Sequence, residues 1–262
     1  HGDPREVFHM FYLSLSPTQN VKITNHFCQL YPFFCAHTLT KQNMIRLAVF
    51  DLDGTLLDTR DDLGTATNHA LKTLGFPEVE LPRYNFLVGR GIMNLFRGAL
   101  PEGYKTEENV ISMKKLFIEY YSEHSRDLTR PYEGIVAMLH MLKDNGVRIA
   151  IASNKYQKGT EELAQFYFPE IDFCRVLGQR EGFPIKPDAE IIGEILRHTE
   201  MAKEDTVYIG DSDVDMMTGA NAGVRTIGAL WGFRTREELE SYHPWHLSES
   251  PSELEEFLRS NL

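Results

Sequence analysis

The residues Ile45-Arg-Leu-Ala-Val-Phe50 run directly into Asp51-Leu-Asp-Gly-Thr55. The first segment is apolar at almost every position, and the second is a polar turn that contains a glycine. Because a strand buried on both faces of a parallel sheet carries apolar residues without alternation, this stretch predicts a buried parallel strand followed by a loop.

Similar transitions from strand to loop recur later in the chain. Val147–Ala152 is an apolar run that ends at Ser153-Asn154, and Thr206–Ile209 ends at Gly210-Asp211. Strands that alternate with helices indicate βαβ units, so we predict an α/β fold with a parallel sheet. A further short strand-like run lies at residues 225–230, and amphipathic helical patterns lie at residues 132–145, 188–198 and 251–258.

The character of the sequence changes after the first strand. Apolar residues recur at helical spacing from Leu63 to Leu74 and from Val110 to Tyr121, and no run in this stretch is typical of a strand. We therefore predict a helical insert at residues 59–130, with residues 44–58 and 131–262 forming the core. Because only two connections join the insert to the core, we expect it to move as a lid.

Residues 1–43 differ from the rest of the chain. They carry few charges, contain Cys28 and Cys35, and show no sustained helical or alternating period. We expect the natural protein to begin at Met44 and this segment to lie outside the fold; a flexible leader is the alternative. The spacing of the two cysteines does not suit a zinc pair, and Cys174 stands alone, so we expect a cytoplasmic protein without disulfides.

The bulk composition excludes two classes of partner. The formal net charge is −11, which disfavours binding to a nucleic-acid backbone. No window approaches the roughly 20 apolar residues that a membrane-spanning helix needs. Hydrophobic residues make up 42% of the chain, which is ample for a core, and nothing in the sequence indicates an oligomeric state.

Asp51 and Asp53 form the first candidate site. Side chains two positions apart point the same way along an extended chain, so two carboxylates would share one small space. Like charges at that separation are costly unless a cation neutralises them or one of them holds a proton. Gly54 permits an unusual backbone turn directly after the pair. The alternatives are an ordinary turn or a fragment of a calcium loop.

Further polar groups fall at or near the carboxyl ends of the predicted strands, where ligands bind in open α/β sheets. Ser153 is a candidate phosphate ligand or else a helix cap, and Lys186 is a candidate phosphate ligand or else a solvated cation. Asp211, Asp213 and Asp215 are candidate metal ligands or else a cap and ordinary acids of a first helical turn. Together with the first pair they provide a nucleophile, an acid/base, oxygen ligands and a cation, as phosphoryl transfer requires.

These motifs resemble those of the haloacid dehalogenase superfamily. Asp51-Leu-Asp-Gly-Thr-Leu-Leu-Asp-Thr59 is similar to its first motif, and Ser153, Lys186 and Gly210–Asp215 match the other three in order and spacing. The resemblance covers about residues 45–258. It implies a Rossmann-like, doubly wound parallel sheet core with an inserted small α-helical cap domain.

The resemblance also implies catalytic roles. Asp51 would attack phosphorus, and Asp53 would protonate the leaving oxygen and later deprotonate a water. Mg²⁺ would be held by the Asp51 carboxylate, the Asp53 backbone carbonyl and Asp211. Ser153 and Lys186 would bind phosphoryl oxygens. Family members that break carbon–halogen or carbon–phosphorus bonds lack a carboxylate at the position of Asp53, so a phosphatase is favoured.

Other residues receive supporting roles by the same resemblance. Thr55 and Asn154 are expected to contact the substrate. Asp215 is expected to orient Lys186 or the water ligands of the metal without binding the metal itself. Arg90 either meets a substrate carboxylate or is a surface arginine between two glycines.

The whole-chain pattern is most similar to bacterial phosphoglycolate phosphatases. Val88-Gly89-Arg90-Gly91 and Ala229-Leu230-Trp231-Gly232-Phe233 carry this similarity. Phosphoglycolate, a small phosphorylated metabolite, is therefore the first expected substrate. Related members hydrolyse sugar phosphates, nucleotides or pyrophosphate, or act as phosphosugar mutases. A phospho-receiver domain and a non-catalytic binding protein are the alternatives outside the enzyme class.

Overall fold

The computed structural model describes residues 44–262. The expectations for the first 43 residues, including those for Cys28 and Cys35, lie outside the described residues. In the described part, no helix is both long and apolar enough to cross a membrane.

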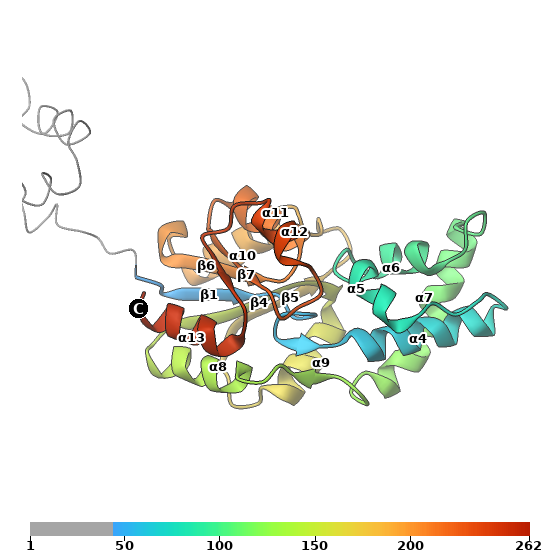
Figure 1. Cartoon of the computed structure of the whole chain (residues 1–262), viewed down its shortest axis with the longest axis horizontal. Helices are drawn as coiled ribbons and strands as arrows, with labels where there is room; N and C mark the ends of the chain where they lie inside the picture. Colours follow the sequence, from blue (N-terminus) through green and yellow to red (C-terminus); the bar gives the residue numbers. More distant parts are fainter. Residues whose placement is uncertain (1–43) are drawn as a thin grey trace, which may run out of the picture. The chain divides into compact units, whose positions relative to one another are not determined.

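The core of the described part is a parallel sheet of six strands in the order β5-β4-β1-β6-β7-β8. The chain first builds outward from β1 through β4 to β5, and then returns to the other side of β1 to form β6, β7 and β8 (Figure 1). This reversal makes the sheet doubly wound, as predicted. The strands are β1 (Leu47–Phe50), β4 (Arg148–Tyr156), β5 (Phe173–Gln179), β6 (Thr206–Gly210), β7 (Arg225–Ala229) and β8 (His246–Ser248).

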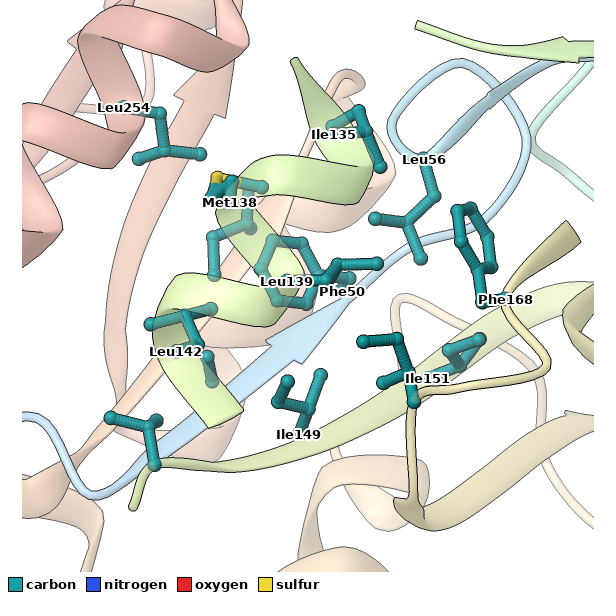
Figure 2. Close-up of a cluster of buried hydrophobic side chains, with 14 of the residues drawn as sticks. Phe50, Leu56, Ile135, Met138, Leu139, Leu142, Ile149, Ile151, Phe168 and Leu254 are labelled. Atoms are coloured by element: carbon teal, nitrogen blue, oxygen red, sulfur yellow. The ribbon is translucent and has the colours of Figure 1, made fainter. Parts of the chain in front are cut away.

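Helices cover both faces of the sheet. One face of β1 and β4 packs on α8 (Ile135–Asp144), α9 (Gln157–Tyr167) and α13 (Pro251–Arg259). Figure 2 shows this cluster, in which Met138, Leu139 and Leu142 of α8 lie over Phe50 and Ile149 of the strands. The other face packs on α10 (Glu190–Thr199) and α11 (Asp213–Ala222). Burial of β1 on both faces explains its unbroken apolar sequence.

A helical insert follows β1, as predicted. It begins and ends at a two-stranded antiparallel ribbon of β2 (Leu57–Asp58) and β3 (Arg130–Pro131) and has its own hydrophobic cluster. The Asp62 carboxylate ties the base of the insert together by accepting bonds from the backbone N–H groups of Leu128 and Thr129. The domain boundaries at residues 59 and 130 stay a prediction. The helices are α4 (Arg60–Thr73), α5 (Tyr84–Leu87), α6 (Ile92–Ala99) and α7 (Glu107–His124).

The structure corrects several sequence-based expectations about the elements. β4 continues to Tyr156, whereas the strand was expected to end at Ala152 and to be followed by Ser153-Asn154-Lys155. Helices 132–145 and 188–198 begin a few residues later than predicted. Strands β5 and β8 and helix α12 (Arg236–Glu240) were not predicted, whereas α9 and α11 were expected only as the helices that Ser153 and Asp211 could cap, without bounds. β5 and β8 are the two edges of the sheet and are only partly buried, so they lack a continuous apolar run.

Candidate active site

Three candidate residues meet at the carboxyl edge of the sheet because β1 lies between β4 and β6. Asp51 directly follows β1, Asp211 directly follows β6, and Ser153 lies in the last part of β4. The chain reverses its direction of winding at β1, and such a switch point opens a crevice at the carboxyl ends of the strands. The predicted convergence of these separate loops is therefore found in the fold.

Lys186 reaches this point from the loop before α10. Its ammonium lies 3.0 Å from Oδ1 of Asp51 and donates to Oδ1 of Asp215 at 2.7 Å. The side chain is 1% exposed, so its interpretation as a solvated loop cation is wrong. Burial acts to lower the pKa of Lys186, but Asp215 and Asp51 together outweigh it and raise the pKa above its usual value.

Asn154 supports Lys186 through the backbone. Its Oδ1 accepts from the Lys186 N–H at 2.8 Å, and its Nδ2 donates to the Lys186 carbonyl at 3.1 Å. The same Nδ2 donates to the carbonyl of Gly89 in the insert at 3.0 Å. Its expected contact with the substrate stays a prediction, while its amide links Lys186 to the insert.

Asp215 is fully occupied by hydrogen bonds. Oδ1 accepts from Lys186 and from the Tyr208 hydroxyl, and Oδ2 accepts from the backbone N–H and hydroxyl of Ser212. Although burial opposes ionisation, Lys186 and these bonds lower the pKa of Asp215 below its usual value. Ser212, and not Asp211, is the N-cap of α11, and Asp215 completes a capping box with it. The Asp215 carboxylate has little capacity left to bind a metal.

Asp51 and Asp211 are buried acids with raised pKa values. With Asp215 they form a buried cluster in which one oxygen from each lies within 4.8 Å of the others. Burial, followed by the neighbouring acids, raises the pKa of Asp51 to about 7 and that of Asp211 to about 8; Lys186 partly offsets the effect at Asp51. Two buried carboxyls that resist ionisation are what a site for a divalent cation would provide.

Thr55 and Gly54 fix the orientation of Asp211. The Thr55 hydroxyl donates to Oδ1 of Asp211 at 3.0 Å, and the Phe233 N–H donates to Oδ2 at 2.8 Å. Gly54 has a φ of +86°, and a Cβ atom there would lie 2.4 Å from the Asp211 carboxylate. The turn after Asp53 therefore requires glycine. The structure places Thr55 on Asp211, and its expected contact with the substrate stays a prediction.

A small cavity lies beside Asp51 at the edge of this cluster. The core contributes Asp51, Asp53, Ser153, Asn154 and Lys155 to its wall. The insert contributes mainly apolar side chains: Leu63, Val88, Ile92, Leu95 and Phe117. The cavity thus has a polar floor at the sheet and an apolar roof, which suits a small ligand with one strongly anionic end.

A model of the family described as haloacid dehalogenase-like hydrolase matches residues 48–229. The chain belongs to this family. The match spans the acid cluster, Lys186 and the helical insert, so it covers every element that contributes to the cavity.

Relatives of this haloacid dehalogenase-like hydrolase extend over most of its length. A phosphoglycolate phosphatase of Vibrio parahaemolyticus is 29% identical over 222 residues, which are 82% of this chain and 96% of that protein. One of Aquifex aeolicus is 29% identical over 83% of this chain and 99% of its own length. A crystal structure from Lactobacillus delbrueckii subsp. bulgaricus, provisionally assigned as a phosphoglycolate phosphatase, superposes with a TM-score of 0.77 at 27% identity; the match covers 82% of this chain and 98% of that one.

Arg90 lies on the insert of this haloacid dehalogenase-like hydrolase but is not part of the cavity wall. Its guanidinium pairs with Oδ2 of Asp213 at 2.5 Å, and the side chain is 54% exposed. Arg234, which was not predicted as a functional residue, makes a second link between the core and the insert. Its side chain is buried, and its guanidinium donates to the carbonyls of Asn85 and Val88. Both arginines connect the insert to the core, and a contact between Arg90 and a substrate stays a prediction.

Lys155 was also missed as a site residue. Its ammonium lies 3.2 Å from Oδ1 of Asp53 and is part of the cavity wall. Its position directly after Ser153-Asn154 was the available signal. Ser153 itself lies in a strand and contributes to the cavity wall, so its interpretation as a helix cap is wrong.

Proposed function

We propose that this chain is a Mg²⁺-dependent phosphatase that hydrolyses a small phosphomonoester through a phospho-aspartate on Asp51. The observation that carries the proposal is the buried contact between Lys186 and Asp51. Asp51 is part of the cavity wall and belongs to the same acid cluster as Asp211. A nucleophilic carboxylate next to a fixed cation and a second acid, Asp53, is an arrangement suited to phosphoryl transfer.

The first chemical step forms the phospho-enzyme. An oxygen of Asp51 attacks phosphorus, and the bond between phosphorus and the ester oxygen breaks. Asp53 donates a proton to that leaving oxygen, so an alcohol departs. Lys186 and the hydroxyl of Ser153 donate to phosphoryl oxygens and stabilise the charge that develops on them.

The second step releases phosphate. Asp53, now ionised, accepts a proton from a water molecule as that water attacks phosphorus. The bond between phosphorus and Asp51 breaks, which regenerates both carboxyl groups and yields inorganic phosphate. The apolar roof of the cavity excludes other water from the phospho-enzyme.

The residues present fit a magnesium ion. Asp51 and Asp211 are the carboxylates with capacity to bind it, whereas Asp215 is occupied by Lys186, Tyr208 and Ser212. When bound, Mg²⁺ supplies positive charge that offsets the acid cluster and the phosphoryl oxygens. Asp215 then acts on Lys186 and not on the metal.

Magnesium affinity should depend on pH. The pKa values of Asp51 and Asp211, raised to about 7 and about 8, mean that binding must displace protons near neutral pH. We expect the affinity to rise with pH, with proton release at about pH 6 that disappears by about pH 9. Titration calorimetry in two buffers of different ionisation enthalpy measures the protons released. The same affinity and no proton release at about pH 6 would contradict this account.

Phosphoglycolate is the substrate that we propose within this class. The relatives at 29% identity and the small size of the cavity support it. The test is a panel of phosphoglycolate, glycerol 1-phosphate, glucose 6-phosphate, a nucleoside monophosphate and 4-nitrophenyl phosphate, assayed with Mg²⁺. We expect kcat/KM for phosphoglycolate to exceed that for each other alkyl phosphate by about tenfold or more. A higher value for a sugar phosphate or a nucleotide would refute this choice and leave the phosphatase assignment intact.

A further inference from the structure

The ammonium of Lys155 joins three separate elements. It donates to Oδ1 of Asp53 in the loop after β1 at 3.2 Å, and to the hydroxyl of Tyr121 in α7 at 2.9 Å. It also lies 4.7 Å from the centre of the Tyr121 ring. The side chain of Lys155 is 3% exposed, and Tyr121 is fully buried. A buried cation held by one group from the core and one from the insert depends on the contact between the two.

An irregularity in β4 directs Lys155 to this place. Ala152 pairs with Leu177 and Tyr156 with Gln179, so three residues of β4 face a single residue of β5. That residue is Gly178, where a Cβ atom would lie 2.6 Å from the Lys155 carbonyl. A bulge of this kind alters the direction of side chains beside active sites, and here it requires glycine on the neighbouring strand.

Asp53 depends on this contact for its orientation. Among residues 44–262, no other side chain pairs with the Asp53 carboxylate. Lys155 occupies Oδ1 and leaves Oδ2 available to a leaving group or a water in the cavity. An acid/base acts efficiently only when its reacting oxygen is held within hydrogen-bond reach of the proton that it transfers.

We propose that Lys155 is a positioning residue for Asp53, and that Tyr121 makes this positioning depend on docking of the helical insert against the core. The inference rests on the proposed function, in which Asp53 is the acid/base. Lys155 gives up no proton in either chemical step. Docking of α7 fixes the ammonium, the ammonium fixes Asp53, and proton transfer to the leaving oxygen becomes efficient only when the insert covers the cavity.

The experiment compares leaving groups. Glycerol 1-phosphate releases a poor leaving group that needs a proton, whereas 4-nitrophenyl phosphate releases a good one that does not. For Lys155→Met we expect kcat/KM to fall by about 10²-fold with glycerol 1-phosphate and by less than about tenfold with 4-nitrophenyl phosphate. Asp53→Asn removes the acid/base itself, so the difference between its losses of kcat/KM with the two substrates is the largest that the positioning variants can reach. Tyr121→Phe removes one hydroxyl, keeps the ring stacked on Phe117, and should show the same contrast at smaller size.

Controls separate positioning from folding and from substrate contact. Lys158→Met removes a lysine that is 81% exposed and should change neither value. Equal losses with both substrates for Lys155→Met and Tyr121→Phe, or no loss with either, would overturn the inference. Lys155→Met is also assayed with phosphoglycolate. A rise in the KM of this variant that is confined to phosphoglycolate would overturn the inference, because Lys155 would then bind the substrate carboxylate. Failure of the wild-type protein on both of these substrates and on phosphoglycolate, with Mg²⁺ supplied, would refute the proposed function itself.

Discussion

Replacing Asp51 by asparagine is expected to lower kcat for every phosphomonoester by a factor on the order of 10⁴ or more. The amide is a poor nucleophile, so no phospho-enzyme can form, although Lys186 and the cavity remain. The measurement is steady-state phosphate release with Mg²⁺. Asp144→Asn, an exposed change at the end of α8, is the matched control and should leave kcat unchanged.

The Asp51→Asn substitution should not destabilise the metal-free protein. Burial raises the pKa of Asp51 from 3.8 to about 7, so the folded protein binds a proton there that the unfolded chain does not. The stability that this proton provides is fully present below about pH 4 and is lost as the pH rises through about 7. At about pH 8 the free energy of unfolding of Asp51→Asn should therefore equal or exceed that of the wild type. A clear decrease in urea denaturation would show that Asp51 mainly stabilises the fold.

Replacing Lys186 by methionine is expected to have the largest effect on stability. Its ammonium lies between Asp51 and Asp215 and also donates to the Ala152 carbonyl. Removal of one partner leaves uncompensated buried charge, which costs about 3–5 kcal/mol. Urea denaturation at neutral pH without metal measures this loss, and phosphate release should also fall to background. Lys158→Met, on the surface of α9, should change the free energy of unfolding by less than about 1 kcal/mol.

A second variant shows where this cost arises. If the unpaired Asp215 carboxylate causes the loss, Lys186→Met combined with Asp215→Asn should recover part of it, although activity stays absent. A loss in the double variant equal to the sum of the two single losses would contradict the proposed coupling between the two side chains. A decrease of less than about 1 kcal/mol in the free energy of unfolding of Lys186→Met alone would also contradict this coupling.

The sequence predicted those parts of the fold that depend on local pattern. β1 is buried on both faces, and α4 and α7 each bury one stripe, so apolar spacing revealed all three. The edge strands β5 and β8 were missed, because strands that are only partly buried do not need a continuous apolar run. The convergence of Asp51, Ser153 and Asp211 could be predicted because parallel strands end at one edge of a sheet.

The remainder of the site depends on contacts between distant parts of the chain. Lys155 reaches Asp53 through a bulge that requires Gly178, 23 positions later in the chain, and its second partner, Tyr121, lies in the insert. Arg90 could not be placed from sequence, because its partner Asp213 lies 123 positions away. Motif spacing gives the residue types of a site, whereas the direction of each side chain is set by tertiary packing.

Chemical trapping of the phospho-enzyme tests the central claim most directly. Wild-type protein is mixed with substrate and Mg²⁺, quenched in acid within one turnover, and reduced with borohydride, which converts an aspartyl phosphate to homoserine. Peptide mass spectrometry should then find homoserine in place of Asp51 and at no other aspartate, and Asp51→Asn should give none. Full turnover with no homoserine at that position, or homoserine at Asp53 or Asp211, would contradict the account.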